Sequence, residues 1–186
     1  SGVDEKREQH WLTYTVSMLL FHIGGFLIIY GVMRLQAMLP FNPAGQSAVY
    51  ANFSGWDTYR SQIQLSALVA PAQTSDMVRS LLLAYDQSGG LPKWPVANGE
   101  TYMMVGDPAL PIIASAYAFG ARNFDTAQAL KDMLAQATTV NDVRPGEALE
   151  AQYGYLPEDG RYGCCNPHGY VPTLLEYDSQ DLALSR

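Results

Sequence analysis

Apolar and polar positions follow different patterns on the two sides of residue 50. From Trp11 to Met33 the chain is apolar and carries no formal charge if His22 is neutral. As a helix rising about 1.5 Å per residue, this stretch spans roughly 34 Å, enough to cross the hydrocarbon core of a bilayer. We therefore predict a transmembrane helix over 11–33 within a membrane segment over 1–50. A buried helix of a soluble protein and a cleaved signal peptide are the alternatives.

The region 51–186 forms the second predicted domain, in which apolar positions recur at helical spacing between prolines and glycines. The predicted helix boundaries are a start at Ser54 with Asp57 and an end before Pro71; a start at Thr74 or Ser75 and an end at Gly89–Gly90; a start at Pro108 and an end at Gly120; a cap at Asp125; and a last helix with Pro172 near its start. The predicted inward residues of the fourth helix are Ala127, Leu130, Leu134 and Ala137, and the last helix carries Leu174, Leu175 and Leu182.

Runs that alternate and are rich in Val and Ile, which would indicate strands, are scarce. The pattern therefore predicts an all-α fold, with helix pairs stacked as in an α/α toroid and joined by long aromatic loops. Binding and catalytic residues concentrate on such loops.

Charge and cysteine content narrow the function. The formal net charge of -7 argues against a nucleic-acid partner, because phosphate binding needs a basic face. The two cysteines, Cys164 and Cys165, are adjacent, which excludes a disulfide framework. With His168 they could suggest zinc, but a structural site needs four ligands, so we predict no metal there.

Two loops combine tryptophan with a carboxylate. Cleavage of a glycosidic bond needs a protonated carboxyl group at the leaving oxygen, and aromatic walls favour that protonated form. Glu100 lies between Trp94 and Tyr102, and Trp56 precedes Asp57. Glu100 is therefore a candidate acid. The alternative is that both tryptophans are core residues, Asp57 is a helix cap and Glu100 is a solvated loop residue.

The motifs FSGWDTYRSQ, TSDMVRSLL, GGLPKWPVANGET, MVGDPA and RNFDTAQAL, with the run EAQYGYLPEDGRYGCCNPHGYVPTLLEYDSQDLALS, occur in this order over residues 53–186. This region resembles glycoside hydrolase family 92, the calcium-dependent, exo-acting, inverting α-mannosidases. The resemblance implies part of an (α/α)6 barrel, with Glu100 as general acid and an α-mannoside or mannose-containing glycan as partner. It also implies substrate-binding roles for Trp56, Asp57, Lys93, Trp94, Thr101 and Asp107.

The same resemblance implies calcium as cofactor, but its ligands and the catalytic base are not matched here. In the family, the base belongs to an Asp-Asp-Cys-Gly-Gln motif and calcium to an Asn-Glu motif, both expected beyond Arg186. Inverting hydrolysis uses an acid and a base together. We therefore expect a truncated α-mannosidase-like chain that is inactive alone.

Residues 2–46 have a second resemblance, carried by GVD at 2–4, EQHW at 8–11 and LPFNP at 39–43. They resemble an early membrane segment of the potassium-binding subunit of the Kdp potassium-transporting ATPase. The resemblance implies contact with a lipid bilayer through residues 11–33. We thus expect a single-pass membrane protein with the hydrolase-like region outside the cytoplasm. Alternatives are a potassium-pump segment with an unrelated tail, a non-catalytic mannose-binding module, and a join produced by sequence assembly.

Overall fold

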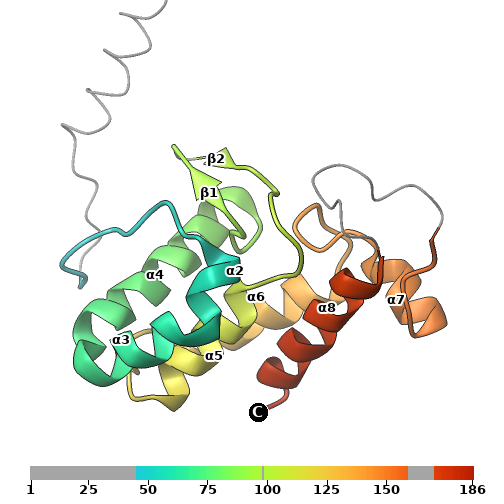
Figure 1. Cartoon of the computed structure of the whole chain (residues 1–186). Coiled ribbons are helices and arrows are strands. Elements are labelled where there is room, and N and C mark those ends of the chain that lie inside the picture. The colour runs from blue at the N-terminus through green and yellow to red at the C-terminus, as the bar shows by residue number, and fades with distance from the viewer. Residues whose placement is uncertain (1–44, 98, 159–169) are drawn as a thin grey trace, which may run out of the picture. The chain divides into compact units, whose positions relative to one another are not determined.

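The computed structural model describes residues 45–97, 99–158 and 170–186. All of them lie in one unit defined by internal contacts, Asn42–Arg186. In chain order its elements are α2 (Gly55–Asp57), the π-helix η1 (Thr58–Gln62), α3 (Ile63–Val69), α4 (Pro71–Ser88), β1 (Pro95–Val96), β2 (Gly99–Glu100), α5 (Ala109–Ala118), α6 (Thr126–Thr138), α7 (Glu147–Tyr153) and α8 (Tyr170–Leu184) (Figure 1).

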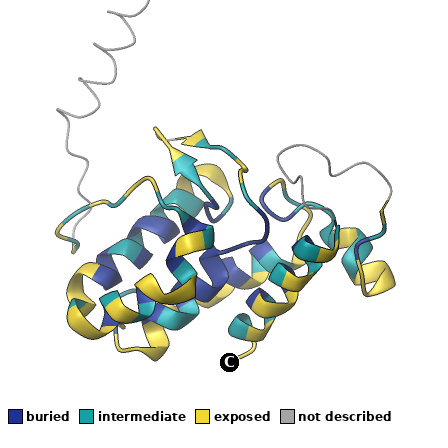
Figure 2. Cartoon of the chain, in the orientation of Figure 1, coloured by how far each residue is buried: buried dark blue, intermediate teal, exposed yellow. Residues whose placement is uncertain are grey.

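The core forms where α3, α4 and α5 meet, with α6 and α8 packed against α5. Its fully buried side chains include Ile63 from α3, Val78 and Leu81 from α4, and Leu110 and Ile112 from α5. Figure 2 shows these helices dark blue on their facing sides and yellow on their outer sides. Burying such side chains is the main favourable contribution to folding.

Local signals explain several helix boundaries. Pro71 occupies the first turn of α4, where its missing N–H is not needed. The helix ends at Gly89, whose φ of 81° is the left-handed conformation that glycine adopts without strain. The Asp125 side chain accepts the N–H of Gln128 at 2.9 Å and caps α6, as predicted.

Other boundary predictions were wrong. Thr74 and Ser75 do not cap α4. They lie buried inside it, and their hydroxyls donate to the carbonyls of Ala70 and Pro71. In α6 the buried positions are Ala129, Asp132, Met133 and Gln136, whereas the predicted inward residues Leu130 and Leu134 are about half exposed, at 51% and 45%.

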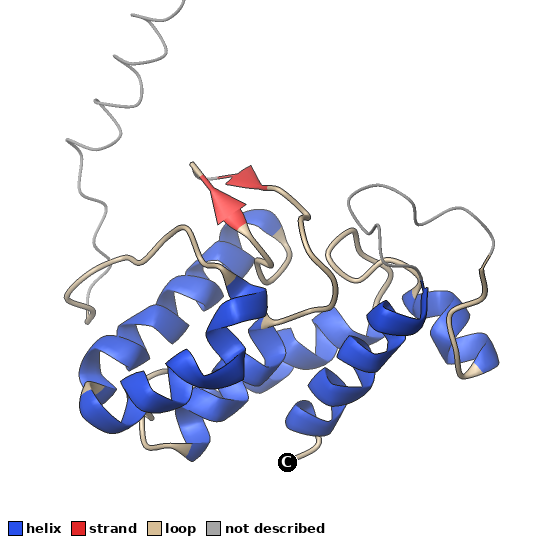
Figure 3. Ribbon diagram, viewed as in Figure 1, coloured by secondary structure: helices blue, strands red, loops and turns tan. Residues whose placement is uncertain are grey.

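The predicted fold class must be corrected. The unit is helical, but β1 and β2 pair as an antiparallel hairpin, Pro95 with Glu100 and Val96 with Gly99, drawn red in Figure 3. Strands of two residues are too short to show alternation, so the pattern gave no signal for them. Within the described ranges, no helix has the length and apolar character needed to cross a membrane. The expected all-α chain with a transmembrane helix therefore does not stand, and the predicted span at 11–33 lies outside the described residues.

Candidate active-site loop

The carboxyl group of Glu100 is held by the backbone of its own loop. Oε2 accepts the N–H of Lys93 at 2.6 Å, and Oε1 accepts the N–H of Tyr102 at 2.8 Å. The N–H of Trp94 is shared between both oxygens, at 3.1 and 3.2 Å. Together with the β1–β2 pairing, these bonds fix a half-buried carboxyl at the base of the hairpin. Each carboxyl oxygen therefore accepts two N–H contacts, of which the contact with Trp94 is shared between them.

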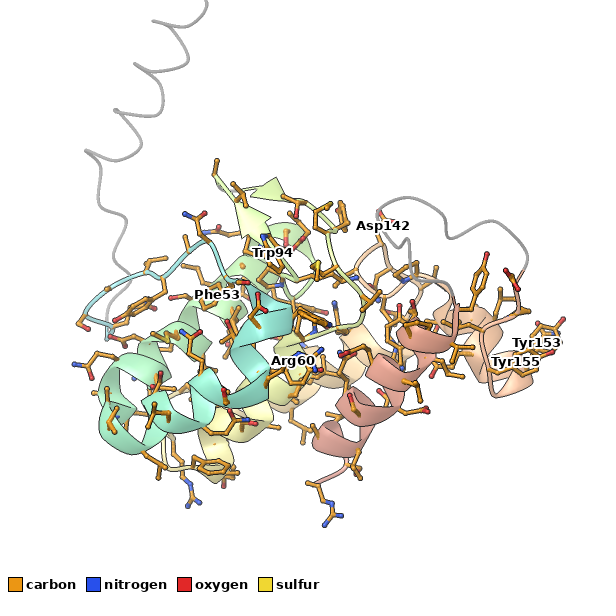
Figure 4. The ribbon with its side chains drawn as sticks, viewed as in Figure 1. Phe53, Arg60, Trp94, Asp142, Tyr153 and Tyr155 are labelled. Carbon is orange, nitrogen blue, oxygen red and sulfur yellow. The ribbon has the colours of Figure 1, made fainter. Side chains whose placement is uncertain are left out.

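Thr101 and Trp94 close the other side of this turn. The Thr101 hydroxyl donates to the Trp94 carbonyl at 2.7 Å. Trp94 is half-buried, and Figure 4 shows it below the hairpin. Glu100, Thr101 and Trp94, all predicted site residues, are thus in direct contact.

Lys93 and Asp107, at the two ends of the loop, are buried rather than open to a ligand. Their exposed fractions are 3% and 0%. The Lys93 ammonium reaches the carbonyl of Met104 at 3.5 Å. Both were predicted to shape the substrate pocket. Here they lie beneath the loop that carries Glu100.

Burial shifts the titration of both groups toward neutrality. It raises the pKa of Asp107 to about 7, although the nearby charges of Arg144 and Lys93 favour the carboxylate. It lowers the pKa of Lys93 to about 8, although Asp107 and Glu100 favour the ammonium. Desolvation therefore outweighs the attraction between these opposite charges.

Trp56 lies in a polar network centred on Glu176 of α8. Glu176 accepts the Trp56 indole N–H at 3.2 Å, the Tyr59 hydroxyl at 2.5 Å and an Arg60 N–H at 2.8 Å. The Arg60 guanidinium carbon lies 3.9 Å from the centre of the Trp56 ring, a cation–π distance. Figure 4 shows Arg60 between the first turns of the α2–α3 helical run and α8.

The same network reaches the end of the Glu100 loop. Gln180, one turn after Glu176, donates to Glu176 at 3.3 Å and accepts the backbone N–H of Asp107 at 2.6 Å. These α8 residues were not predicted as part of the site. Their helical spacing of four was the one sequence signal that placed them on a common face.

Gly55 brings the Trp56 helix against the Glu100 loop. A Cβ atom at this position would lie 2.4 Å from the Lys93 carbonyl oxygen and 2.5 Å from Pro108 Cγ. Only glycine permits such an approach. The helical turn that carries Trp56 therefore packs directly against the loop that carries Glu100. Asp57 is exposed and accepts the Ser54 hydroxyl at 2.5 Å.

A metal site needs several donor side chains close together. The described part of the chain contains no group of three or more His, Cys, Asp or Glu side chains that could hold a metal ion. These residues thus do not fit calcium, and no catalytic step is assigned to it. The Cys164, Cys165 and His168 group lies outside the described residues.

Comparison with known proteins identifies the family. The profile of the glycosyl hydrolase family 92 catalytic domain matches residues 33–186. The chain belongs to this family. A solved family GH92 alpha-mannosidase from Bacteroides thetaiotaomicron, in complex with mannoimidazole, is 28% identical, with a TM-score of 0.69 over 77% of this chain and 18% of that protein. The family GH92 inverting mannosidase of the same organism, at 24% identity and a TM-score of 0.64, covers 74% of this chain and 18% of its own, and shows the same fold.

A second set of relatives belongs to another class of protein. The potassium-transporting ATPase potassium-binding subunit of Bradyrhizobium diazoefficiens is 64% identical over 80 residues, which cover 37% of this chain and 14% of that subunit. The subunit of Rhodopseudomonas palustris is 53% identical over 79 residues, again 37% of this chain and 14% of the subunit. The family 92 chain therefore also carries potassium-subunit sequence, consistent with the predicted chimera. It spans less than a fifth of the relatives named here.

Proposed function

We propose that this chain is an α-mannosidase-like fragment that binds a terminal α-mannoside through the Glu100 loop and the first turns of the α2–α3 helical run. The observation that carries the proposal is the fixed carboxyl of Glu100, held by three backbone N–H groups in a loop that packs against the helical turn of Trp56. The family GH92 relative solved with mannoimidazole supports a mannoside as ligand.

In this proposal Glu100 is the general acid. It would protonate the leaving oxygen of the glycosidic bond from a position that the backbone sets in advance, which removes the need to order a mobile side chain. The wall beside the sugar would be formed by Trp56, Trp94 and Thr101. The exposed Asp57 carboxylate would accept hydrogen bonds from the sugar hydroxyls. Lys93 and Asp107, being buried, would support the loop rather than contact the sugar.

Acid catalysis alone does not complete inverting hydrolysis, because a second carboxylate must activate water across roughly 6.5–9.5 Å. The sequence contains no Asp-Asp-Cys-Gly-Gln segment. We therefore propose binding without turnover by this chain alone.

The test is a titration of the full chain with methyl α-mannoside, using intrinsic tryptophan fluorescence and calorimetry. Methyl α-glucoside, which differs at one hydroxyl, serves as the ligand control. We expect saturable binding of the mannoside that is lost in Trp56→Ala, and no mannose released from α-1,2-mannobiose with added calcium. Absence of mannoside binding would refute the proposed ligand, and steady release of mannose would refute the proposed inactivity.

The potassium-subunit sequence supports a second candidate, a fusion in which the first part of the chain derives from a potassium-transporting ATPase. A single long DNA read across codons 40–60 and both neighbouring genes tests it. An uninterrupted reading frame through the join supports a true fusion, whereas separate frames would show an assembly error.

A further inference from the structure

The loop that carries Glu100 adopts an unusual backbone. Ala97, Tyr102 and Met104 have positive φ angles of 51°, 56° and 69°. Residues with a side chain rarely adopt this left-handed conformation, and bulky ones least of all. Such residues persist only where their surroundings hold them, and they cluster at functional sites.

The backbone of each of these three residues makes its own hydrogen bond to another part of the loop or its surroundings. The Ala97 N–H donates to Asn52 Oδ1 at 3.2 Å, and the Tyr102 N–H donates to Glu100 Oε1 at 2.8 Å. The Met104 carbonyl accepts from the buried Lys93 ammonium at 3.5 Å. The strained backbone is therefore held at three separate points, one of which is the carboxyl group of the candidate acid.

The side chains that this backbone presents are apolar and accessible. Tyr102 is 46% exposed and Met103 is 43% exposed. A rigid aromatic ring gives a large contact area with little loss of conformational freedom on binding. The Tyr102 backbone N–H donates to Glu100, so the point from which the ring extends is fixed beside the proposed proton donor.

We infer that Tyr102 is a specificity-determining residue whose ring binds the sugar on the leaving-group side of the bond that Glu100 would protonate. The inference rests on the proposed function and extends it. The preferred ligand class is then an α-mannoside whose leaving group is a second pyranose ring, because a small alkyl group offers nothing to pack against the tyrosine.

The test compares the Kd of α-1,2-mannobiose with that of methyl α-mannoside on the full chain, by calorimetry. The unmodified chain should bind the disaccharide about fivefold more tightly, the size expected for one aromatic contact. Tyr102→Asn removes the ring but retains a residue that tolerates the left-handed conformation. It should bring the ratio of the two Kd values to about one without changing the Kd of the monosaccharide.

Two variants serve as controls. Tyr102→Phe keeps the ring and should keep the preference. Tyr117→Asn removes an aromatic ring of equal exposure, 46%, from α5 and should also leave the preference unchanged. A disaccharide preference that survives in Tyr102→Asn, or is absent from the unmodified chain while methyl α-mannoside still binds, overturns the inference and leaves the proposed function standing. Failure of both ligands to bind overturns both.

A second measurement covers the case in which Tyr102→Asn fails to fold. Saturation-transfer NMR on the unmodified chain with α-1,2-mannobiose, with aromatic protons irradiated, should show transfer to the protons of the reducing-end ring, and Tyr102→Phe should retain it. Transfer confined to the non-reducing ring overturns the inference.

Discussion

The indole N–H of Trp56 donates to Glu176 Oε1 at 3.2 Å, and these two residues join the first turn of the described helices to the last helix. The Glu176 side chain is 13% exposed and also binds Tyr59 and Arg60. It therefore fixes both the orientation of a proposed sugar-binding tryptophan and the packing of α8.

Replacing Glu176 should show the strength of this network. Glu176→Gln removes the charge and sets an amide N–H₂ group against existing donors. We expect a loss of about 2 to 3 kcal/mol in the free energy of unfolding, because partly buried donors lose their acceptor while the exposed Arg60 is resolvated. Urea unfolding followed by tryptophan fluorescence measures the loss. Asp178→Asn, on an exposed position of α8, is the matched control. Equal stabilities of the two variants would contradict the prediction.

A second prediction concerns Gly55 and the Lys93 carbonyl. Alanine usually stabilises a helix relative to glycine. Here the new Cβ would lie 2.4 Å from a backbone oxygen that cannot move independently. Gly55→Ala should therefore lower stability by about 2 kcal/mol and the Tm by about 4 to 8 °C.

Gly90→Ala is the matched control for Gly55→Ala. Its new Cβ would meet its nearest atoms at 3.6 and 3.8 Å, which is ordinary contact. We expect its Tm to stay within about 2 °C of that of the unmodified chain. A Gly55→Ala variant as stable as the unmodified chain would show that the loop is not packed on α2 as described.

Proline, glycine and cap residues made much of the helix order predictable. Pro108, Gly89 and Asp125 act through local backbone geometry, which a short stretch of sequence determines. The buried face of α6 was not predictable in this way. Gln136 is buried because its amide both donates to and accepts from the backbone of Leu91, at 3.3 Å each, a partner 45 positions away.

The candidate site also has features that local sequence predicts and features that depend on distant contacts. The motifs indicated Glu100, Trp56 and Trp94 as candidates, and their roles stay predictions. In the structure the Trp94 N–H contacts Glu100, and Gly55, the neighbour of Trp56, packs on the Lys93 carbonyl. The burial of Asp107 could not be predicted from the motif, because α8 packs over this end of the loop through Gln180. The left-handed residues Tyr102 and Met104 carried no glycine signal.

A third prediction concerns Asp76, which docks the chain before α2 onto α4. Asp76 is 4% exposed, accepts the backbone N–H of Ser47 at 2.8 Å and the Ser47 hydroxyl, and pairs with Arg79 at 2.8 Å. Asp76→Ala should cost about 1.5 to 3 kcal/mol, the range for hydrogen bonds to a charged group, because Ser47 and Arg79 lose the buried acceptor that holds them on α4. It should also expose residues 45–52 to limited proteolysis. Asp142→Ala, at an exposed position labelled in Figure 4, is the control, and the protease should cleave it no faster than it cleaves the unmodified chain. Unchanged cleavage in Asp76→Ala would contradict the docking.

The last prediction is a pH dependence that arises from Asp107. Burial raises its pKa in the folded chain to about 7 from 3.8, so between these values the folded chain keeps a proton that the unfolded chain releases. Stability contributed by this group is therefore full at low pH, falls as pH rises toward 7, and levels off above it. One proton corresponds to a slope of at most about 1.4 kcal/mol per pH unit.

Comparison with Asp107→Asn isolates the contribution of Asp107 to the pH dependence of stability, because the amide does not titrate. Between pH 5.5 and 7 the unmodified chain should lose about 1.6 kcal/mol relative to Asp107→Asn, measured as the difference in urea unfolding free energy at each pH. The range stops below the pKa of Lys93, lowered by burial to about 8, above which loss of the ammonium reverses the trend. Asp142→Asn, which removes an exposed carboxylate, should follow the unmodified chain. Parallel curves for the unmodified chain and Asp107→Asn would mean that Asp107 titrates in contact with water and does not lie beneath the loop.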